Sequence, residues 1–218
     1  MKVILRINAK KLVLVCAVMS LTIALTVQTA SAQKKDQSRH IHPPPTASSA
    51  KALPPPKLSI PDVEVFDQDG RKQNFYADLV KDKVVIINFV FTTCKVTCPL
   101  SGANFSKLQT LLGERLGRDV FLISVSTDPE TDSSDKLKAW GERFNAKAGW
   151  TLITGESKEV ARLLRVLKGD GLDKDYHAPS LYMVNDVKKT YRRAFGLEDP
   201  ARIIKMVDEL ATAVQDVK

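Results

Sequence analysis

Residues 84–106 read VVIINFVFTTCKVTCPLSGANFS. The stretch begins with an almost unbroken apolar run, residues 84–91, which is typical of a strand buried on both faces. Two cysteines follow, Cys94 and Cys98, and a helical pattern of apolar residues comes after them. We therefore expect the two thiols where a buried strand gives way to a helix. The N–H groups and the dipole at the start of a helix favour negative charge, so a thiolate should form there more easily than in a free cysteine.

A cysteine pair this close in sequence has two interpretations. A structural disulfide between Cys94 and Cys98 would close so short a loop that it would constrain the unfolded chain very little. The other interpretation is a functional pair, because a thiolate is both the nucleophile of disulfide chemistry and a soft metal ligand. The spacing therefore favours a redox or metal centre.

The composition is that of a globular protein. The chain has 218 residues, of which 44% are hydrophobic and 27% are charged. The formal net charge is +8, and Lys2, Arg6, Lys10 and Lys11 supply four of these charges in a segment without acidic residues. The remaining +4 is small and scattered, which argues against a nucleic-acid partner.

Residues 1–32 have the pattern of a secretory signal peptide. A basic start precedes an apolar core at residues 12–27, and Ala30-Ser31-Ala32 gives an A-x-A cleavage signature before Gln33. Cys16 lies in the apolar core and is expected to leave with the signal. We predict a periplasmic or otherwise exported protein, which would be membrane-associated if the segment stays as an uncleaved anchor.

Cleavage would leave only Cys94 and Cys98 in an exported and oxidising compartment. An exported disulfide framework usually has more cysteines, spread along the chain, so one tight pair again indicates a redox or metal centre. Residues 33–57 are polar and proline-rich, and are predicted to form a disordered linker. Its histidines, His40 and His42, are either part of a solvated tail or a weak auxiliary metal site.

The folded domain is predicted at residues 58–218. Strands are expected at residues 63–66, 73–76, 84–91, 119–126, 150–154, 180–184 and 189–194. The first helix is expected after the cysteines, with Phe105, Leu108, Leu111, Leu112 and Leu116 on one face. The second is expected after Ser133 or Ser134, with Leu137, Trp140 and Phe144 on one face, and the third at residues 156–168. The fourth is expected after Asp199, with Ile203, Ile204, Val207, Leu210, Ala211 and Val214 inward. This alternation predicts an α/β fold, a thioredoxin-like three-layer α/β/α sandwich with a mixed sheet.

The predicted domain has a single histidine, His177, directly before Ala178-Pro179 and a strand. A lone histidine is usually structural or merely exposed. In thioredoxin-like folds, however, the segment that enters this strand packs against the dithiol, which would bring His177 close to both sulfurs. Two thiolates and one imidazole make a soft three-ligand site suited to Cu(I). We therefore predict Cys94, Cys98 and His177 as metal ligands. Asp128 is predicted to belong to a turn that precedes a helix.

Four motifs resemble the Sco/SenC family of copper-handling proteins with a thioredoxin fold. They are FTTCKVTCP at residues 91–99, STDPETD at 126–132, GWTLITG at 149–155, and DYH at 175–177 followed by LYM at 181–183. The resemblance covers residues 58–214, and the order and spacing of the motifs make it specific. The chain departs from the family pattern at Lys95 and Val96, at Tyr176 before the histidine, and at Ala178-Pro179 after it.

The resemblance implies a metallochaperone that binds one copper ion, with Cu(I) favoured over Cu(II), and helps assemble the binuclear copper site of cytochrome c oxidase. Its partner would be the copper subunit of the oxidase or another copper or thiol client protein. The alternative is a thiol-disulfide oxidoreductase in which Cys94 or Cys98 attacks a target disulfide and the other cysteine resolves it. A peroxiredoxin is a weaker third hypothesis, because Ile87 stands where that family has proline.

Overall fold

A seven-stranded mixed sheet forms the centre of the domain. The computed structural model describes residues 58–168 and 179–212. The strands lie in the order β2-β1-β5-β4-β3-β6-β7, in which β3, β4 and β5 run parallel and the remaining neighbours run antiparallel. Their bounds are β1 Glu64–Asp67, β2 Lys72–Asn74, β3 Val84–Val90, β4 Val120–Ser126, β5 Trp150–Thr154, β6 Ser180–Asn185 and β7 Thr190–Phe195.

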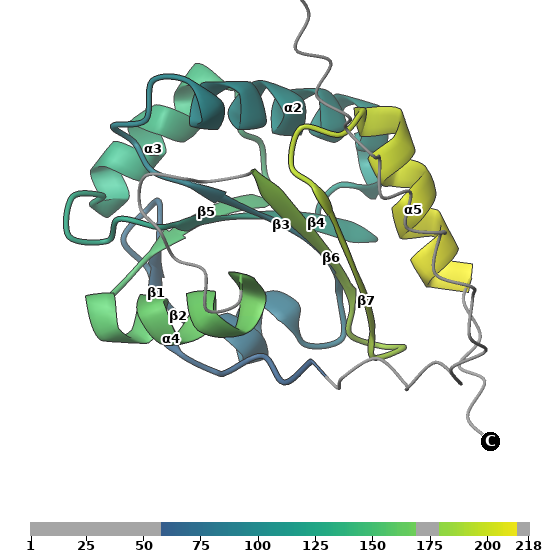
Figure 1. Ribbon diagram of the computed structural model, residues 1–218, viewed down its shortest axis with the longest axis horizontal. Coiled ribbons are helices and arrows are strands. Elements are labelled where there is room, and N and C mark those ends of the chain that lie inside the picture. Colours follow the sequence, from purple (N-terminus) through teal and green to yellow (C-terminus); the bar gives the residue numbers. More distant parts are fainter. Residues whose placement is uncertain (1–57, 169–178, 213–218) are drawn as a thin grey trace, which may run out of the picture. The chain divides into compact units, whose positions relative to one another are not determined.

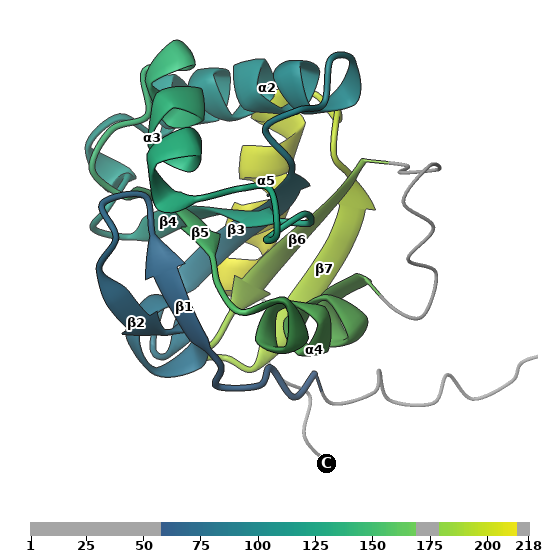
Figure 2. The same ribbon diagram turned by 90° about the vertical axis from the view of Figure 1, so that its left-hand side faces the viewer.

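Helices cover both faces of this sheet, which confirms the predicted three layers (Figures 1 and 2). The α-helices are α2 Thr97–Leu112, α3 Ser134–Arg143, α4 Ser157–Lys168 and α5 Pro200–Thr212, and short helical turns lie at η1 Phe75–Val80 and η2 Gly113–Arg115. One core packs α2, α3 and α5 against the sheet, and the other packs α4 and η1 against the opposite face. None of the helices in this described part is long and apolar enough to cross a membrane.

The central strand is buried on both faces, as its apolar run predicts. Along β3, Ile86 and Val90 belong to the core under α2, whereas Val85 and Ile87 belong to the core over α4. Side chains that alternate between two covered faces explain why the strand has no polar side. The one polar residue within it, Asn88, is also buried.

Side chains cap α3 and α5 as the sequence indicates. Ser133 Oγ accepts a hydrogen bond from the backbone N–H of Lys136 at the start of α3. Asp199 Oδ1 accepts hydrogen bonds from the N–H groups of Ala201 and Arg202 at the start of α5. Each cap satisfies donors that have no partner within the helix.

Several predicted details are wrong. The second strand ends at Asn74, because Phe75 turns inward and starts η1. On α2, Leu111 is 55% exposed, and Leu116 lies beyond the helix although it packs on the same core. On α5, Ala211 is exposed. Helical periodicity selects a stripe of residues, but neighbouring elements decide how wide the covered part of that stripe is.

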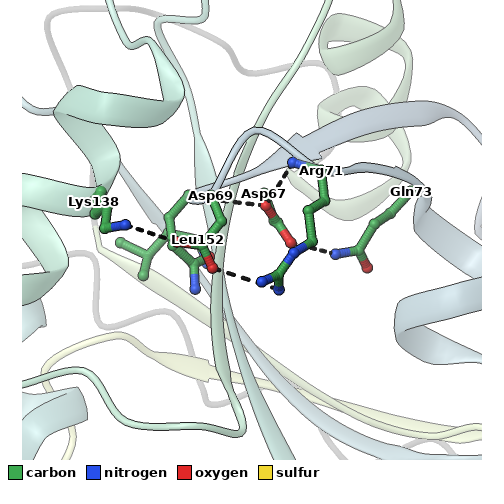
Figure 3. A network of polar contacts seen from close by, with 7 residues as sticks. Asp67, Asp69, Arg71, Gln73, Lys138 and Leu152 are labelled. Atoms are coloured by element: carbon green, nitrogen blue, oxygen red, sulfur yellow. Dashed lines mark hydrogen bonds and ion pairs between the residues drawn. The ribbon is translucent and has the colours of Figure 1, made fainter.

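A buried carboxylate organises the turn between β1 and β2 (Figure 3). Asp67 accepts hydrogen bonds from the N–H groups of Asp69 and Arg71 and from the side-chain amide of Gln73. Asp69 in turn pairs with Lys138 of α3 at 3.0 Å. This network holds the hairpin against α3. The hairpin lies away from the central strand β3, because β5 and β4 separate β1 from it.

Candidate functional site

The dithiol lies at the edge of the sheet where β3 ends. Cys94 is in the loop after β3, with its N–H bonded to the carbonyl of Phe91 at 3.2 Å, and Cys98 is the second residue of α2. Cys94 is half-buried, Cys98 is 5% exposed, and both are free thiols. The predicted position, between a buried strand and a helix, is confirmed.

The sulfur of Cys94 caps the helix that carries Cys98. The first residue before α2, Val96, makes no side-chain capping bond, and the first turn contains no acidic residue. Instead, the N–H of Cys98 donates to Cys94 Sγ at 3.3 Å. The helix N-terminus therefore directs its unpaired donors at one sulfur of the pair.

The two thiols differ in acidity. Burial works to raise the pKa of Cys94, but the N–H and thiol of Cys98 and the N–H groups of Val96 and Thr97 together hold that pKa below its ordinary value. Burial raises the pKa of Cys98 to about 12, and the bond to Cys94 and the charge of Asp132 act in the same direction. The prediction of an easily formed thiolate is thus confirmed for Cys94. It is wrong for Cys98, because burial raises the pKa of that thiol although it lies at the start of the helix.

This asymmetry predicts selective alkylation. With the protein reduced and folded at about pH 7, iodoacetamide should modify Cys94 and leave Cys98 as a thiol, because only the thiolate reacts. As the pH rises, Cys94 should reach its maximal rate earlier than a free cysteine, and Cys98 should stay slow until the pH approaches about 12. Peptide mass analysis measures both rates, and unfolded protein is the control in which they become similar. Equal labelling in the folded protein would contradict the assignment.

A buried aspartate anchors the loop that precedes Cys94. The carboxylate of Asp132 is fully buried and accepts hydrogen bonds from the N–H of Thr92 at 3.0 Å, the Thr92 hydroxyl at 2.5 Å and the Ser126 hydroxyl at 2.6 Å. Asp132 is not among the site residues that the sequence predicts. The signal was present, because Asp132 ends the STDPETD motif, but its partner Thr92 lies 40 positions away.

Asp128 has the role predicted for it. Its carbonyl accepts hydrogen bonds from the N–H groups of Thr131 and Asp132, and its own N–H donates to the Ser126 hydroxyl. The residue thus builds the turn after β4. The turn brings the side chain of Asp132 back to the end of β3.

A chain of buried hydrogen bonds lies in the core beneath the dithiol helix. Trp150 Nε1 donates to Ser124 Oγ, which donates to Asn88 Oδ1, and Asn88 Nδ2 donates to Ser101 Oγ on α2. The chain joins β5, β4 and β3 to the first turns of α2. Because each buried polar group in it has a partner, it fixes the helix that carries Cys98 against the sheet.

The third predicted ligand, His177, lies outside the described residues, as do His40 and His42. The first residue described after the gap is Pro179, whose carbonyl accepts a hydrogen bond from the N–H of Gly196 at 2.7 Å. Strand β6 begins at the edge where β3 ends, because Leu181 pairs with Asn88. Among residues 58–168 and 179–212, no three His, Cys, Asp or Glu side chains are grouped to hold a metal ion.

The sheet, its two helical layers and the dithiol at the start of α2 define a thioredoxin-like protein with a C-x-x-x-C pair. The SCO1/SenC family model matches residues 56–212, and the chain belongs to this family.

Individual relatives agree with this assignment. The chain is 31% identical to the SCO1 protein homolog of Bacillus subtilis over 150 residues, which cover 63% of this chain and 76% of that protein. A SCO1/SenC family lipoprotein from Bacillus anthracis shares the fold with a TM-score of 0.60 at 28% identity, covering 71% of this chain and 96% of that chain. BsSco is a member of the Sco family of cytochrome c oxidase assembly proteins in which a disulfide switch has been identified. It shares the fold with a TM-score of 0.61 at 26% identity, covering 74% of this chain and 98% of that chain.

Proposed function

We propose that the protein is an exported copper metallochaperone that helps assemble the binuclear copper site of cytochrome c oxidase. The observation that carries the proposal is the reduced dithiol, in which an accessible sulfur with a lowered pKa lies beside a buried thiol. Membership of the SCO1/SenC family supports the same function. The copper ion is cargo, which the protein takes up and passes to a client.

The donor chemistry fits Cu(I). Thiolates and imidazole are preferred ligands of this soft ion, and Cys94, Cys98 and His177 would supply both kinds. His177 stands two residues before Pro179 in the sequence. The start of β6 lies at the dithiol edge of the sheet, which supports His177 as the third ligand.

Protonation sets the order in which the ligands act. Cys94 is the first donor, because its thiolate forms below the ordinary pKa of a cysteine. Cys98 carries a proton at neutral pH, and copper has to displace that proton before the second sulfur binds. Oxidation of the pair to a disulfide removes both sulfur donors, so only the reduced protein would carry copper.

A thiol-disulfide oxidoreductase is the second candidate function, and the unequal acidity of the two thiols favours it. The Cys94 thiolate would attack a target disulfide to form a mixed disulfide and release one target thiolate. Cys98 would then lose its proton, attack Cys94 Sγ and release the second target thiolate. The target gains two electrons, and the protein is left with a Cys94–Cys98 disulfide.

We also propose export, with residues 1–32 as a cleaved signal peptide, residues 33–57 as a linker and the functional domain after them. The intact mass of the protein from its native host should correspond to a chain that begins at Gln33. A full-length product retained in the membrane would instead indicate an anchored protein.

Deletion of the gene in the native host tests the proposed delivery. Cytochrome c oxidase activity should fall, and wild-type protein but not the Cys94→Ser variant should restore it. Additional copper in the medium should also restore part of the activity, because mass action can fill the oxidase site without a carrier. Restoration by a thiol reductant but not by copper would favour the oxidoreductase. Unchanged oxidase activity would contradict delivery to the oxidase.

A further inference from the structure

We infer that Asp132 is a positioning residue that holds the dithiol in its reduced, metal-competent arrangement by anchoring the Cys94 loop through Thr92. The inference deepens the proposed function at the same site. It rests on the contacts of a fully buried carboxylate with Thr92, in the loop that leads to Cys94.

The anchor is short and strong. Asp132 Oδ1 accepts from both the N–H and the hydroxyl of Thr92, and Asp132 Oδ2 accepts from the Ser126 hydroxyl at the end of β4. Hydrogen bonds to a buried carboxylate are among the stronger ones in proteins. They join the carboxyl ends of β3 and β4 and fix the position of Thr92, two residues before Cys94.

The anchor favours the dithiol over the disulfide. In the reduced protein Cys94 Sγ accepts from the N–H of Cys98, and the two thiols are hydrogen-bonded. Formation of the disulfide brings the sulfurs to a bond length of about 2.05 Å, and we take this approach to include movement of the loop that carries Cys94. The bonds from Thr92 to Asp132 resist this movement, which shifts the equilibrium toward the reduced form.

The redox equilibrium of the dithiol measures this effect without copper. In a glutathione buffer, the two thiols give two electrons and two protons to glutathione disulfide, which becomes two glutathione thiols. We expect Asp132→Asn to shift this equilibrium toward the protein disulfide by about tenfold, which corresponds to about 30 mV. A lower stability shared by both redox states would leave the equilibrium unchanged.

Substitution of Thr92 separates the anchor from the charge of Asp132. Thr92→Val removes the hydroxyl bond but keeps the carboxylate and the backbone bond, so we expect a smaller shift of about threefold. Thr92→Ser keeps the hydroxyl and should behave like wild type. Because valine has nearly the shape of threonine, this variant also carries the test if Asp132→Asn fails to fold.

The matched control is Asp67→Asn. Asp67 is also a buried carboxylate with three donors, but it lies on the β1–β2 hairpin (Figure 3). This variant should lose stability and keep the wild-type redox equilibrium. The inference is wrong if Thr92→Val and Asp132→Asn keep the wild-type equilibrium, or if Asp67→Asn shifts it equally.

Copper affinity is the second readout. A misplaced first ligand should weaken Cu(I) binding by reduced Asp132→Asn about tenfold, as loss of a supporting residue does at other metal sites. Wild-type protein that binds no copper would contradict the proposed function, and the redox equilibrium would still decide the role of Asp132. Wild-type copper affinity in Asp132→Asn would contradict the inference alone.

Discussion

Cys94→Ser and Cys98→Ser should each abolish disulfide formation and lower the Cu(I) affinity by more than about a hundredfold. Loss of a supporting residue already lowers metal affinity about tenfold to a hundredfold, and loss of a thiolate ligand should have a larger effect. Serine is close in size to cysteine, so both variants should fold, although Cys98 packs in the core under α2. A chelator competition and a thiol titration measure the two effects.

Thr93→Ser is the matched control for these variants, because Thr93 is an exposed neighbour of Cys94. It should bind copper like wild type and show two thiols after reduction and none after mild oxidation. Two thiols that persist in oxidised wild-type protein would show that the sulfurs cannot meet. Copper binding that survives in either serine variant would contradict a site built on both sulfurs.

His177→Ala should weaken Cu(I) binding by at least about tenfold to a hundredfold and leave the dithiol oxidisable. Disulfide exchange needs only the two sulfurs, whereas a stable three-coordinate copper site needs a third donor. The same chelator competition measures this loss, and a glutathione buffer measures the redox equilibrium. The variant therefore separates metal binding from thiol chemistry.

The control is a variant that carries His40→Ala and His42→Ala together. These histidines belong to the proline-rich segment, so their loss should leave the copper affinity unchanged. Equal copper affinity of His177→Ala and wild type would mean that the third ligand is wrong. A large loss in the control would instead assign a ligand to residues 33–57.

Local pattern was sufficient to predict most of the fold. The apolar run of β3 and the heptad-like spacing of Val160, Leu163, Leu164 and Leu167 on α4 predict their burial correctly, because each element is covered along its whole apolar face. Leu111 belongs to the same helical stripe as Leu108 but is exposed. Its exposure depends on how far neighbouring elements cover α2, and that is a property of the tertiary structure.

The site could be predicted only in part. The spacing of Cys94 and Cys98 identifies the dithiol, since short-range sequence decides that both lie at one strand-helix junction. The unequal pKa values depend on how deeply each sulfur is buried, which the sequence does not encode locally. The role of Asp132 depends on a contact with Thr92, and these two residues follow the ends of the neighbouring strands β4 and β3. Assignment of His177 as a ligand stays a prediction.

Anaerobic Cu(I) titration of the reduced protein, in competition with a chelator, tests the central claim most directly. We predict one tightly bound copper ion per chain, and no binding after the dithiol has been oxidised, because the disulfide lacks both thiolate ligands. Reduced protein that binds no copper but reduces a model disulfide would contradict the metallochaperone and assign the dithiol to thiol-disulfide exchange.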